Sequence, residues 1–296
     1  MEVVNVVNGK TELYGVLGDP IEHTKSPFIH NTLFKQFNIN AIYIPIHVNE
    51  VCLENAINGL KAQNISGFNV TVPHKKSIIK YLDDISNDAL LMGAVNTVKN
   101  IQGKLKGYNT DAEGFVRDFK DGLDTNFKDK RVMLFGAGGT ARALAVKLAS
   151  EGIEHLTLVN RTEQNAKNIT ELVKNNYGSI VSYILPDSPM LFDQMSQSHI
   201  IINTTPSGMS TYLDSTPFNI DYVFDKNQVV YDVVYSPEKT KFLLQAESYG
   251  CKTRNGFGML INQGVSAFEI WTGKLVSRQM AIELLNNIIK MKDFPK

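Results

Sequence analysis

Cysteine is scarce in this chain, and no metal-ligand pattern is present. Only 2 of the 296 residues are cysteines, Cys52 and Cys251. Two cysteines so far apart, without the spacing of metal ligands, predict reduced thiols in a cytoplasmic protein rather than a disulfide framework. The 6 histidines form neither an HxxxH nor an HExxH pattern. The sequence therefore predicts no bound metal.

Long apolar runs and an excess of one charge are also missing. No uninterrupted apolar stretch approaches the ~18 residues that a membrane helix needs, and the first residues lack the basic and apolar regions of a signal peptide. Lys plus Arg and Asp plus Glu number 30 each, so net charge favours neither a nucleic acid nor a membrane as partner. With 43% hydrophobic and 20% charged residues, the composition is that of a globular protein.

The first third of the chain alternates between strand-like and helix-like segments. Strands are predicted over 13–18, 41–47 and 67–72, and helices over 26–37 and 51–63. Pro27 suits the first turn of its helix, where a missing N–H costs nothing. Strands separated by helices of this length predict right-handed βαβ crossovers and a largely parallel sheet.

The third of these strands ends in an informative way. Val70, Thr71 and Val72 are followed by Pro73, which cannot donate to a strand ladder. The chain then presents the Thr71 hydroxyl and the Lys75 ammonium at the carboxyl end of the strand, where open α/β sheets bind their ligands. The alternative interpretation is a strand edge followed by two solvated lysines.

A second unit is predicted to start near Asp111. Its strands are expected over 131–135, 155–160, 200–204 and 229–233, and its helices over 142–150 and 163–175. This βαβαβ order is typical of a nucleotide-binding half of a doubly wound sheet. Two final helices, predicted over 258–271 and 277–291, are expected to pack back on the first unit, which makes that domain discontinuous.

The first strand of the second unit leads into a dinucleotide fingerprint, Gly136-x-Gly138-x-x-Ala141. Gly136 allows a tight turn, Gly138 lets the backbone approach a pyrophosphate, and Ala141 keeps the helix close to the strand. The helix N-terminus then faces the phosphate charge. A lone match would be weak, but this one follows a strand and opens a helix within a βαβ unit.

The end of the next strand indicates which dinucleotide is bound. NAD sites usually carry an acidic residue there, whereas this chain has Asn160, Arg161 and Thr162. A guanidinium flanked by hydrogen-bond donors suits a 2′-phosphate. NADP is therefore the predicted cofactor, and the alternative is a solvated arginine on a loop.

Nine motifs in order resemble those of the shikimate dehydrogenase family, which reduces 3-dehydroshikimate with NADPH in aromatic amino-acid and chorismate biosynthesis. They are GDPIEHTKSPFIHN (18–31), GFNVTVPHK (67–75), GAVNT (93–97), GYNTDAEG (107–114), GAGGTARA (136–143), NRT (160–162), NTTPSGM (203–209), YDVVYSP (231–237) and NGFGMLINQG (255–264). The resemblance covers nearly the whole chain, and it implies an NADP-dependent oxidoreductase acting on a CH–OH group.

The resemblance also implies a fold and a domain division. The fold class is α/β, with an N-terminal open α/β substrate domain, a Rossmann-type doubly wound NADP-binding domain, and the active site in the cleft between them. The substrate domain would span 1–110, completed by the C-terminal helices of 257–296, and the NADP-binding domain would span 111–256. The implied partner is a small molecule, shikimate or 3-dehydroshikimate, and the protein is expected to be a monomer or homodimer.

Site residues follow from the motifs of the family. The resemblance makes Lys75 and Asp111 the catalytic pair. It assigns the substrate to Thr24, Ser26, Thr71, Asn96, Gln263 and Tyr235. It assigns the cofactor to Gly136, Ala137, Gly138, Gly139, Thr140, Ala141, Asn160, Arg161, Thr162, Thr205, Met209, Val233, Gly256 and Met259.

Each assignment has a structural alternative. Ser26 would cap a helix, as would Asp111 if the helix began at Ala112. Asn96 would bend the chain at a turn, and Gln263 would be an exposed residue in mid-helix. A titratable ammonium such as that of Lys75 nevertheless suits proton transfer to a developing alkoxide better than a guanidinium does.

The chain departs from the family pattern at two positions. Thr24 stands where serine is common, which leaves the range of substrates open. Asn165 stands where strongly NADP-specific relatives often have a second arginine, with Lys167 nearby, so the preference for NADP is expected to be moderate. Two alternatives therefore remain: a quinate/shikimate dehydrogenase that also uses NAD, and a non-catalytic nucleotide- or metabolite-sensing relative.

Overall fold

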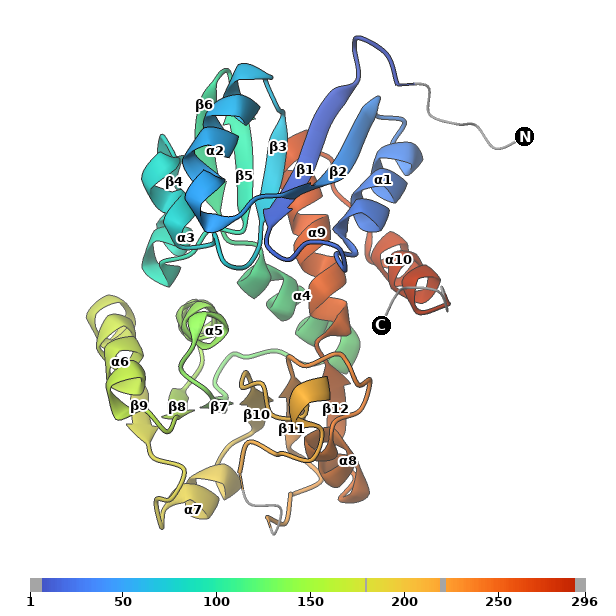
Figure 1. Ribbon diagram of the computed structural model, residues 1–296. Helices are drawn as coiled ribbons and strands as arrows, with labels where there is room; N and C mark the ends of the chain where they lie inside the picture. Colours follow the sequence, from blue (N-terminus) through green and yellow to red (C-terminus); the bar gives the residue numbers. More distant parts are fainter. Residues whose placement is uncertain (1–6, 179, 219–221, 291–296) are drawn as a thin grey trace. The chain divides into compact units, whose positions relative to one another are not determined.

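The structure is a computed structural model that describes residues 7–178, 180–218 and 222–290. The chain divides into two compact units (Figure 1). The first comprises Met1–Thr110 with Ile261–Lys296, and the second comprises Asp111–Leu260. No helix in the described part of the chain is both long and apolar enough to cross a membrane.

The first unit is built on a six-stranded sheet of order β2-β1-β3-β5-β6-β4. Its strands are β1 (Glu12–Gly18), β2 (Ala41–His47), β3 (Gly67–Val70), β4 (Asp84–Ile85), β5 (Thr97–Ile101) and β6 (Lys104–Tyr108). Its helices are α1 (Ser26–Gln36), α2 (Leu53–Ala62), α3 (Asn87–Met92), most of α9 (Phe257–Thr272) and α10 (Arg278–Lys290), with 3-10 turns at Glu50–Cys52 and Ser77–Tyr81.

The three strands predicted for this unit pair parallel, as expected, and the sheet is mixed because of two further pairings. β1 runs parallel to β2 and β3, but β5 pairs antiparallel with both β3 and β6. The expected strand over 67–72 also ends earlier, at Val70, before the proline. β5 and β6, which lie outside the predicted strands, form a hairpin around Gly103 at φ 86°, and a hairpin needs no crossover helix.

The second unit is a six-stranded, fully parallel sheet of order β12-β11-β10-β7-β8-β9. Its strands are β7 (Arg131–Phe135), β8 (His155–Val159), β9 (Val181–Ile184), β10 (Ile200–Asn203), β11 (Val229–Asp232) and β12 (Lys252–Asn255). Its helices are α4 (Asp111–Leu123), α5 (Gly139–Ser150), α6 (Glu163–Tyr177), α7 (Leu191–Ser196) and α8 (Lys241–Ser248), with a 3-10 turn at Ser210–Tyr212. Counted from β7, the order is 3-2-1-4-5-6, that of the Rossmann fold.

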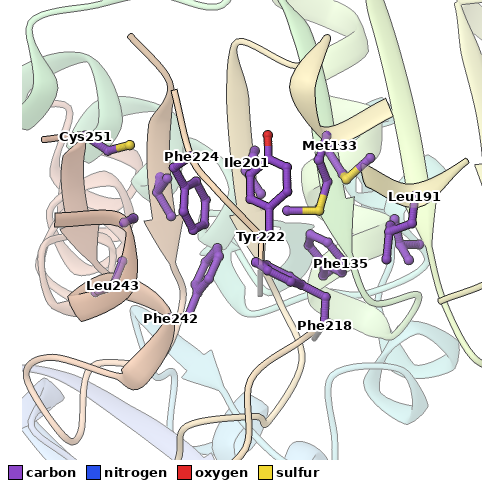
Figure 2. Close-up of a cluster of buried hydrophobic side chains, with 14 residues drawn as sticks. Met133, Phe135, Leu191, Ile201, Phe218, Tyr222, Phe224, Phe242, Leu243 and Cys251 are labelled. Atoms are coloured by element: carbon purple, nitrogen blue, oxygen red, sulfur yellow. The ribbon is translucent and has the colours of Figure 1, made fainter. Parts of the chain in front are cut away.

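Apolar side chains cover both faces of this parallel sheet, as its near-continuous hydrophobic strands require. On one face, Met133, Phe135 and Ile201 pack against aromatic residues of the segment that leads to β11 and against α8 (Figure 2). On the other face, Phe115 and Phe119 of α4 contact Tyr231 of β11. The sheet is therefore a rigid support for the loops at its carboxyl edge.

Candidate functional site

Several candidate site residues follow neighbouring strand ends of the first sheet because of its topology. β1 lies between β2 and β3 and runs parallel to both. The carboxyl ends of β1 and β3 are therefore neighbours, and the segments that follow them start at the same edge of the sheet. Thr24 and Ser26 follow β1, and Thr71 and Lys75 follow β3. The two ends pack tightly, because any side chain in place of Gly18 would collide with the Thr71 methyl group.

The two hydroxyl residues after β1 are close to each other. The backbone N–H of Ser26 donates to the Thr24 hydroxyl at 3.3 Å. Ser26 is buried and is the first residue of α1, one position after the N-cap residue Lys25. The structure therefore does not place Ser26 at the N-cap position, as the capping alternative requires. Between the two hydroxyls lies Lys25, and burial lowers the pKa of its ammonium.

Asn96 belongs to the same edge because β5 runs antiparallel to β3. It directly precedes β5, is 2% exposed, and its Oδ1 accepts the Thr110 N–H at 2.7 Å. Its Nδ2 donates to the Thr110 hydroxyl at 3.0 Å and to Gln263 Oε1 at 3.5 Å. These bonds fix the orientation of the Asn96 amide. Gln263 of α9 is buried, so the expectation of an exposed glutamine was wrong.

A buried chain of hydrogen bonds connects the hydroxyl side of this edge to the amide side, and sequence reasoning missed it. The Tyr43 hydroxyl donates to Asn69 Oδ1 at 2.7 Å, and it is also hydrogen-bonded to Ser26. Asn69 Nδ2 donates to the Asn96 carbonyl and to the Thr97 hydroxyl, both at 3.0 Å. Asn69 lies within the motif GFNVTVPHK, and that placement between two hydrophobic neighbours was the available signal.

The predicted catalytic residues lie at the ends of two different elements. Lys75 is partly exposed in the segment after β3, and its carbonyl accepts the Val95 N–H at 2.8 Å, next to Asn96. Asp111 is the first residue of α4 and directly follows Thr110. The predicted helix start at Ala112 is thus one residue late, and the Asp111 carboxylate stands where a helix N-terminus favours negative charge.

The second unit has a pocket of about 600 Å³ at the carboxyl edge of its sheet, within the usual range for ligand sites. It lies where β7 and β10 leave the sheet, the switch point of the Rossmann order. Six predicted cofactor residues line it, namely Gly136, Ala137, Gly138, Asn160, Arg161 and Thr205. The rest of the lining comes from Phe135, Val159, Thr204, Pro206 and Ser207, and from Pro186, Tyr212 and residues 215–217. Sequence reasoning missed Pro186, Tyr212 and residues 215–217.

The glycines of the fingerprint have different structural roles. Gly136 has φ 109°, and a Cβ there would lie 2.5 Å from the Thr204 hydroxyl oxygen. Gly138 has an ordinary φ of −85°, and a Cβ there would meet no atom within 4 Å. The fold therefore requires glycine only at position 136. The open space at Gly138 and the uncapped N-terminus of α5 fit a pyrophosphate group.

Further predicted residues surround this loop. α5 begins at Gly139, three residues earlier than the helix expected from 142, and Ala141 is buried. Arg161 is exposed and is the only charged residue in the described lining of the pocket. Asn160 Nδ2 donates to the Thr162 carbonyl at 2.9 Å, which shapes the turn beside Arg161. This donor set and the cavity together fit an NADP molecule.

Eight predicted cofactor residues lie outside the pocket lining, namely Gly139, Thr140, Ala141, Thr162, Met209, Val233, Gly256 and Met259. Met209 is exposed on the loop after β10. Val233 and Gly256 are in backbone contact, since a Cβ on Gly256 would collide with the Val233 carbonyl. Met259 lies in the first turn of α9, and the ring of Tyr235 is 6.0 Å from that of Phe257 in the same turn.

One buried carboxylate near the pocket was not expected from the sequence. Asp232, at the end of β11, is 0% exposed and accepts hydrogen bonds from Asn203 Nδ2, the Val234 N–H and the Thr240 hydroxyl. Burial raises its pKa to about 6. Its place in the motif YDVVYSP was the only available signal. In the described residues, no three His, Cys, Asp or Glu side chains are grouped as a metal site would require.

Known protein families match the chain in three segments. Residues 16–98 match the shikimate dehydrogenase substrate binding domain, residues 119–213 match shikimate / quinate 5-dehydrogenase, and residues 256–279 match the shikimate 5'-dehydrogenase C-terminal domain. A shikimate dehydrogenase (NADP(+)) of Caldanaerobacter subterraneus subsp. tengcongensis is 39% identical over 94% of this chain and 97% of that protein. The chain belongs to the shikimate dehydrogenase family.

Solved structures of the family have the same fold. The shikimate 5-dehydrogenase of Listeria monocytogenes, solved with shikimate and NAD, superposes with a TM-score of 0.89 at 34% identity and covers 96% of this chain and 98% of that one. A shikimate dehydrogenase solved with NADP+ superposes with a TM-score of 0.84 at 39% identity, over 96% of this chain and 98% of that one. The predicted family and α/β fold class are confirmed.

Proposed function

We propose that this protein is a shikimate dehydrogenase, which catalyses the reversible NADPH-dependent reduction of 3-dehydroshikimate to shikimate in chorismate and aromatic amino-acid biosynthesis. The observation that carries the proposal is that this member of the family has both a candidate substrate site and a candidate cofactor site. Residues with hydroxyl, amide and ammonium groups adjoin the ends of the neighbouring strands β1, β3 and β5 of the first sheet, and a glycine loop with one arginine lines a pocket at the switch point of the second. Membership of the family, with relatives named as NADP-dependent, supports the reaction and the cofactor.

The first unit carries the substrate residues in this proposal. Thr24 and Ser26 present small hydroxyls beside the N-terminus of α1, a favourable place for a carboxylate. Asn96 and Gln263, whose amides are 3.5 Å apart, bind ring hydroxyls. Thr71 and Tyr235 complete the predicted shell.

Lys75 donates the proton to the oxygen that becomes the alcohol in the reductive direction, and removes it in the oxidative one. Asp111 orients the ammonium of Lys75 and accepts from the same substrate hydroxyl. When bound, the nicotinamide supplies the hydride. Holding the substrate in one orientation is the contribution of the hydroxyl and amide residues, because reaction requires a near-attack geometry.

The second unit carries the cofactor residues. Gly138 leaves room for the pyrophosphate, and Arg161 pairs with the 2′-phosphate. Because Asn165 replaces a second arginine, the proposed preference for NADP over NAD is moderate. We place the substrate domain at 1–110 with 257–296 and the NADP-binding domain at 111–256, in a cytoplasmic monomer or homodimer.

A spectrophotometric assay at the nicotinamide band tests this proposal. Purified protein should reduce NADP with shikimate faster than it reduces NAD or acts on quinate. Activity with quinate and NAD at comparable efficiency would favour the broader dehydrogenase, and inactivity with every pair would favour a sensing relative.

Lys75 and Lys76 provide a matched pair for the chemical step. Lys75→Met should lower kcat by about 10²–10⁴-fold with little change in KM, the usual range for a positioned acid or base. Lys76→Met should have little effect, because Lys76 is exposed whereas Lys75 is partly buried. Equally small effects of the two substitutions would contradict the assignment of Lys75.

A further inference from the structure

Asp232 is a buried carboxylate that the proposed chemistry does not use. It lies at the end of β11, beside β10 in the sheet, with Asn203 directly opposite in the register. Asn203 Nδ2 donates to Asp232 Oδ1 at 2.9 Å, and the Val234 N–H donates to the same oxygen at 3.0 Å. A carboxylate without solvent contact at a sheet edge needs such partners, because burying a charge is otherwise costly.

Asn203, which Asp232 holds by a hydrogen bond, is itself hydrogen-bonded to residues in the wall of the cofactor pocket. Its Oδ1 accepts both the Thr205 N–H at 2.9 Å and the Thr205 hydroxyl at 2.7 Å, and its Nδ2 donates also to the Ser207 carbonyl at 3.3 Å. Thr205 and Ser207 both line the pocket. The amide of Asn203 thus sets the first half of the loop, and Asp232 sets which way that amide faces.

Thr240 ties the second half of the same loop to Asp232. Its hydroxyl donates to Asp232 Oδ2 at 2.6 Å and accepts the Leu243 N–H at the start of α8. Gly208, at φ 89°, packs against Thr240, since a Cβ on Gly208 would lie 2.7 Å from the Thr240 methyl group. Asp232 therefore holds the 204–209 loop at two separate points.

We propose that Asp232 is a positioning residue for NADP binding, acting through Asn203 and Thr240 on the loop that lines the cofactor pocket. This inference rests on the proposed function in that it takes the pocket of the second unit as the NADP site. Asp232 itself lines no part of the pocket that the structure describes. Its effect on the cofactor is therefore indirect.

The geometry also predicts which substitution should preserve the function. An asparagine at position 232 keeps an oxygen that accepts from Asn203 and Val234, and its amide N–H can donate to Thr240, whose hydroxyl oxygen has a free lone pair. Asp232→Asn should therefore retain the loop, whereas Asp232→Ala removes both points of support.

Fluorescence titration with NADPH measures the effect without any turnover. Asp232→Ala should raise the Kd for NADPH about tenfold, the effect of losing one or two buried hydrogen bonds on binding. Asp232→Asn should stay within about threefold of the wild-type Kd by the same reasoning. The KM for shikimate at saturating NADP should change less than twofold in both variants. The reason is that the substitutions alter the cofactor pocket and therefore weaken the binding of NADP, not that of shikimate.

Asp118→Asn is the matched control. Asp118 is also buried in the second unit, but it is paired with Arg254 and Tyr231 and not with the loop. It should lower the melting temperature and leave the Kd for NADPH unchanged. An unchanged Kd in Asp232→Ala, or an equal rise in Asp118→Asn, would overturn the inference. Wild-type protein that binds NADPH but does not oxidise shikimate would instead contradict the proposed function, so the two failures are distinguishable.

Discussion

His30 should make the first unit sensitive to acid. Its side chain is 0% exposed, stacks on Tyr43 at 4.3 Å between ring centroids, and lies 4.9 Å from Trp271. Neither ring nitrogen has a hydrogen-bond partner of good geometry among the described residues, although Asn69 lies near enough to favour the protonated form slightly. Burial dominates and lowers the pKa of His30 to about 3.

The pKa difference between the folded and unfolded chain sets the size of the effect. In the unfolded chain the pKa of His30 is 6.5, so between pH 6.5 and about 3 only the unfolded chain binds this proton. The stability is then complete above pH 6.5 and falls as the pH decreases, by about 1.4 kcal/mol for each pH unit. At pH 4.5 the free energy of unfolding should therefore be about 3 kcal/mol lower on account of His30 alone.

His30→Phe removes the titrating group and keeps an aromatic ring. Urea unfolding can be followed through Trp271, the only tryptophan, which is part of the same cluster. Between pH 7.0 and 4.5 the wild type should lose about 3 kcal/mol more stability than the variant, whatever the cost of repacking, because the remaining groups titrate alike in both. His23→Gln, at an exposed position, serves as the control. If wild type and His30→Phe lose the same amount, the burial argument fails.

Five further substitutions test the two sites. Arg161→Ala should raise the KM for NADP and leave that for NAD almost unchanged, because only NADP has a 2′-phosphate; steady-state kinetics with both cofactors would show an equal rise if Arg161 merely shaped its loop. Ser26→Ala should raise the KM for shikimate several-fold at constant KM for NADP, while Thr24→Ser stays close to wild type; a normal shikimate KM in Ser26→Ala would exclude this segment from the site. Gly136→Ala should lower the free energy of unfolding by more than about 1 kcal/mol, because its φ is positive and Thr204 is close. Gly138→Ala should have the melting temperature of the wild type but a higher Kd for NADPH. A lower melting temperature with an unchanged Kd would refute the pyrophosphate assignment.

The sequence was sufficient wherever the signal was local. The strand over 131–135, the glycine turn at Gly136 and the helix that follows are set by residues within a few positions of one another, and the structure has all three. The same is true of α1, whose predicted start at Ser26 is exact and whose end differs by one residue. Local propensity and periodicity determine such elements before any tertiary contact forms.

Pairing between distant segments could be decided only by the tertiary structure. Nothing near residues 97–108 shows that β5 lies antiparallel to β3, yet this pairing brings Asn96 beside the segment after β3. Likewise, Asn96 and Gln263 are separated by 167 residues and meet through their amides. The connection of Asp232 to the cofactor pocket depends on the neighbouring positions of β10 and β11 in the sheet. Hydrogen bonds of this kind depend on sheet order and register, and a residue's sequence neighbours do not encode which strand will lie beside it.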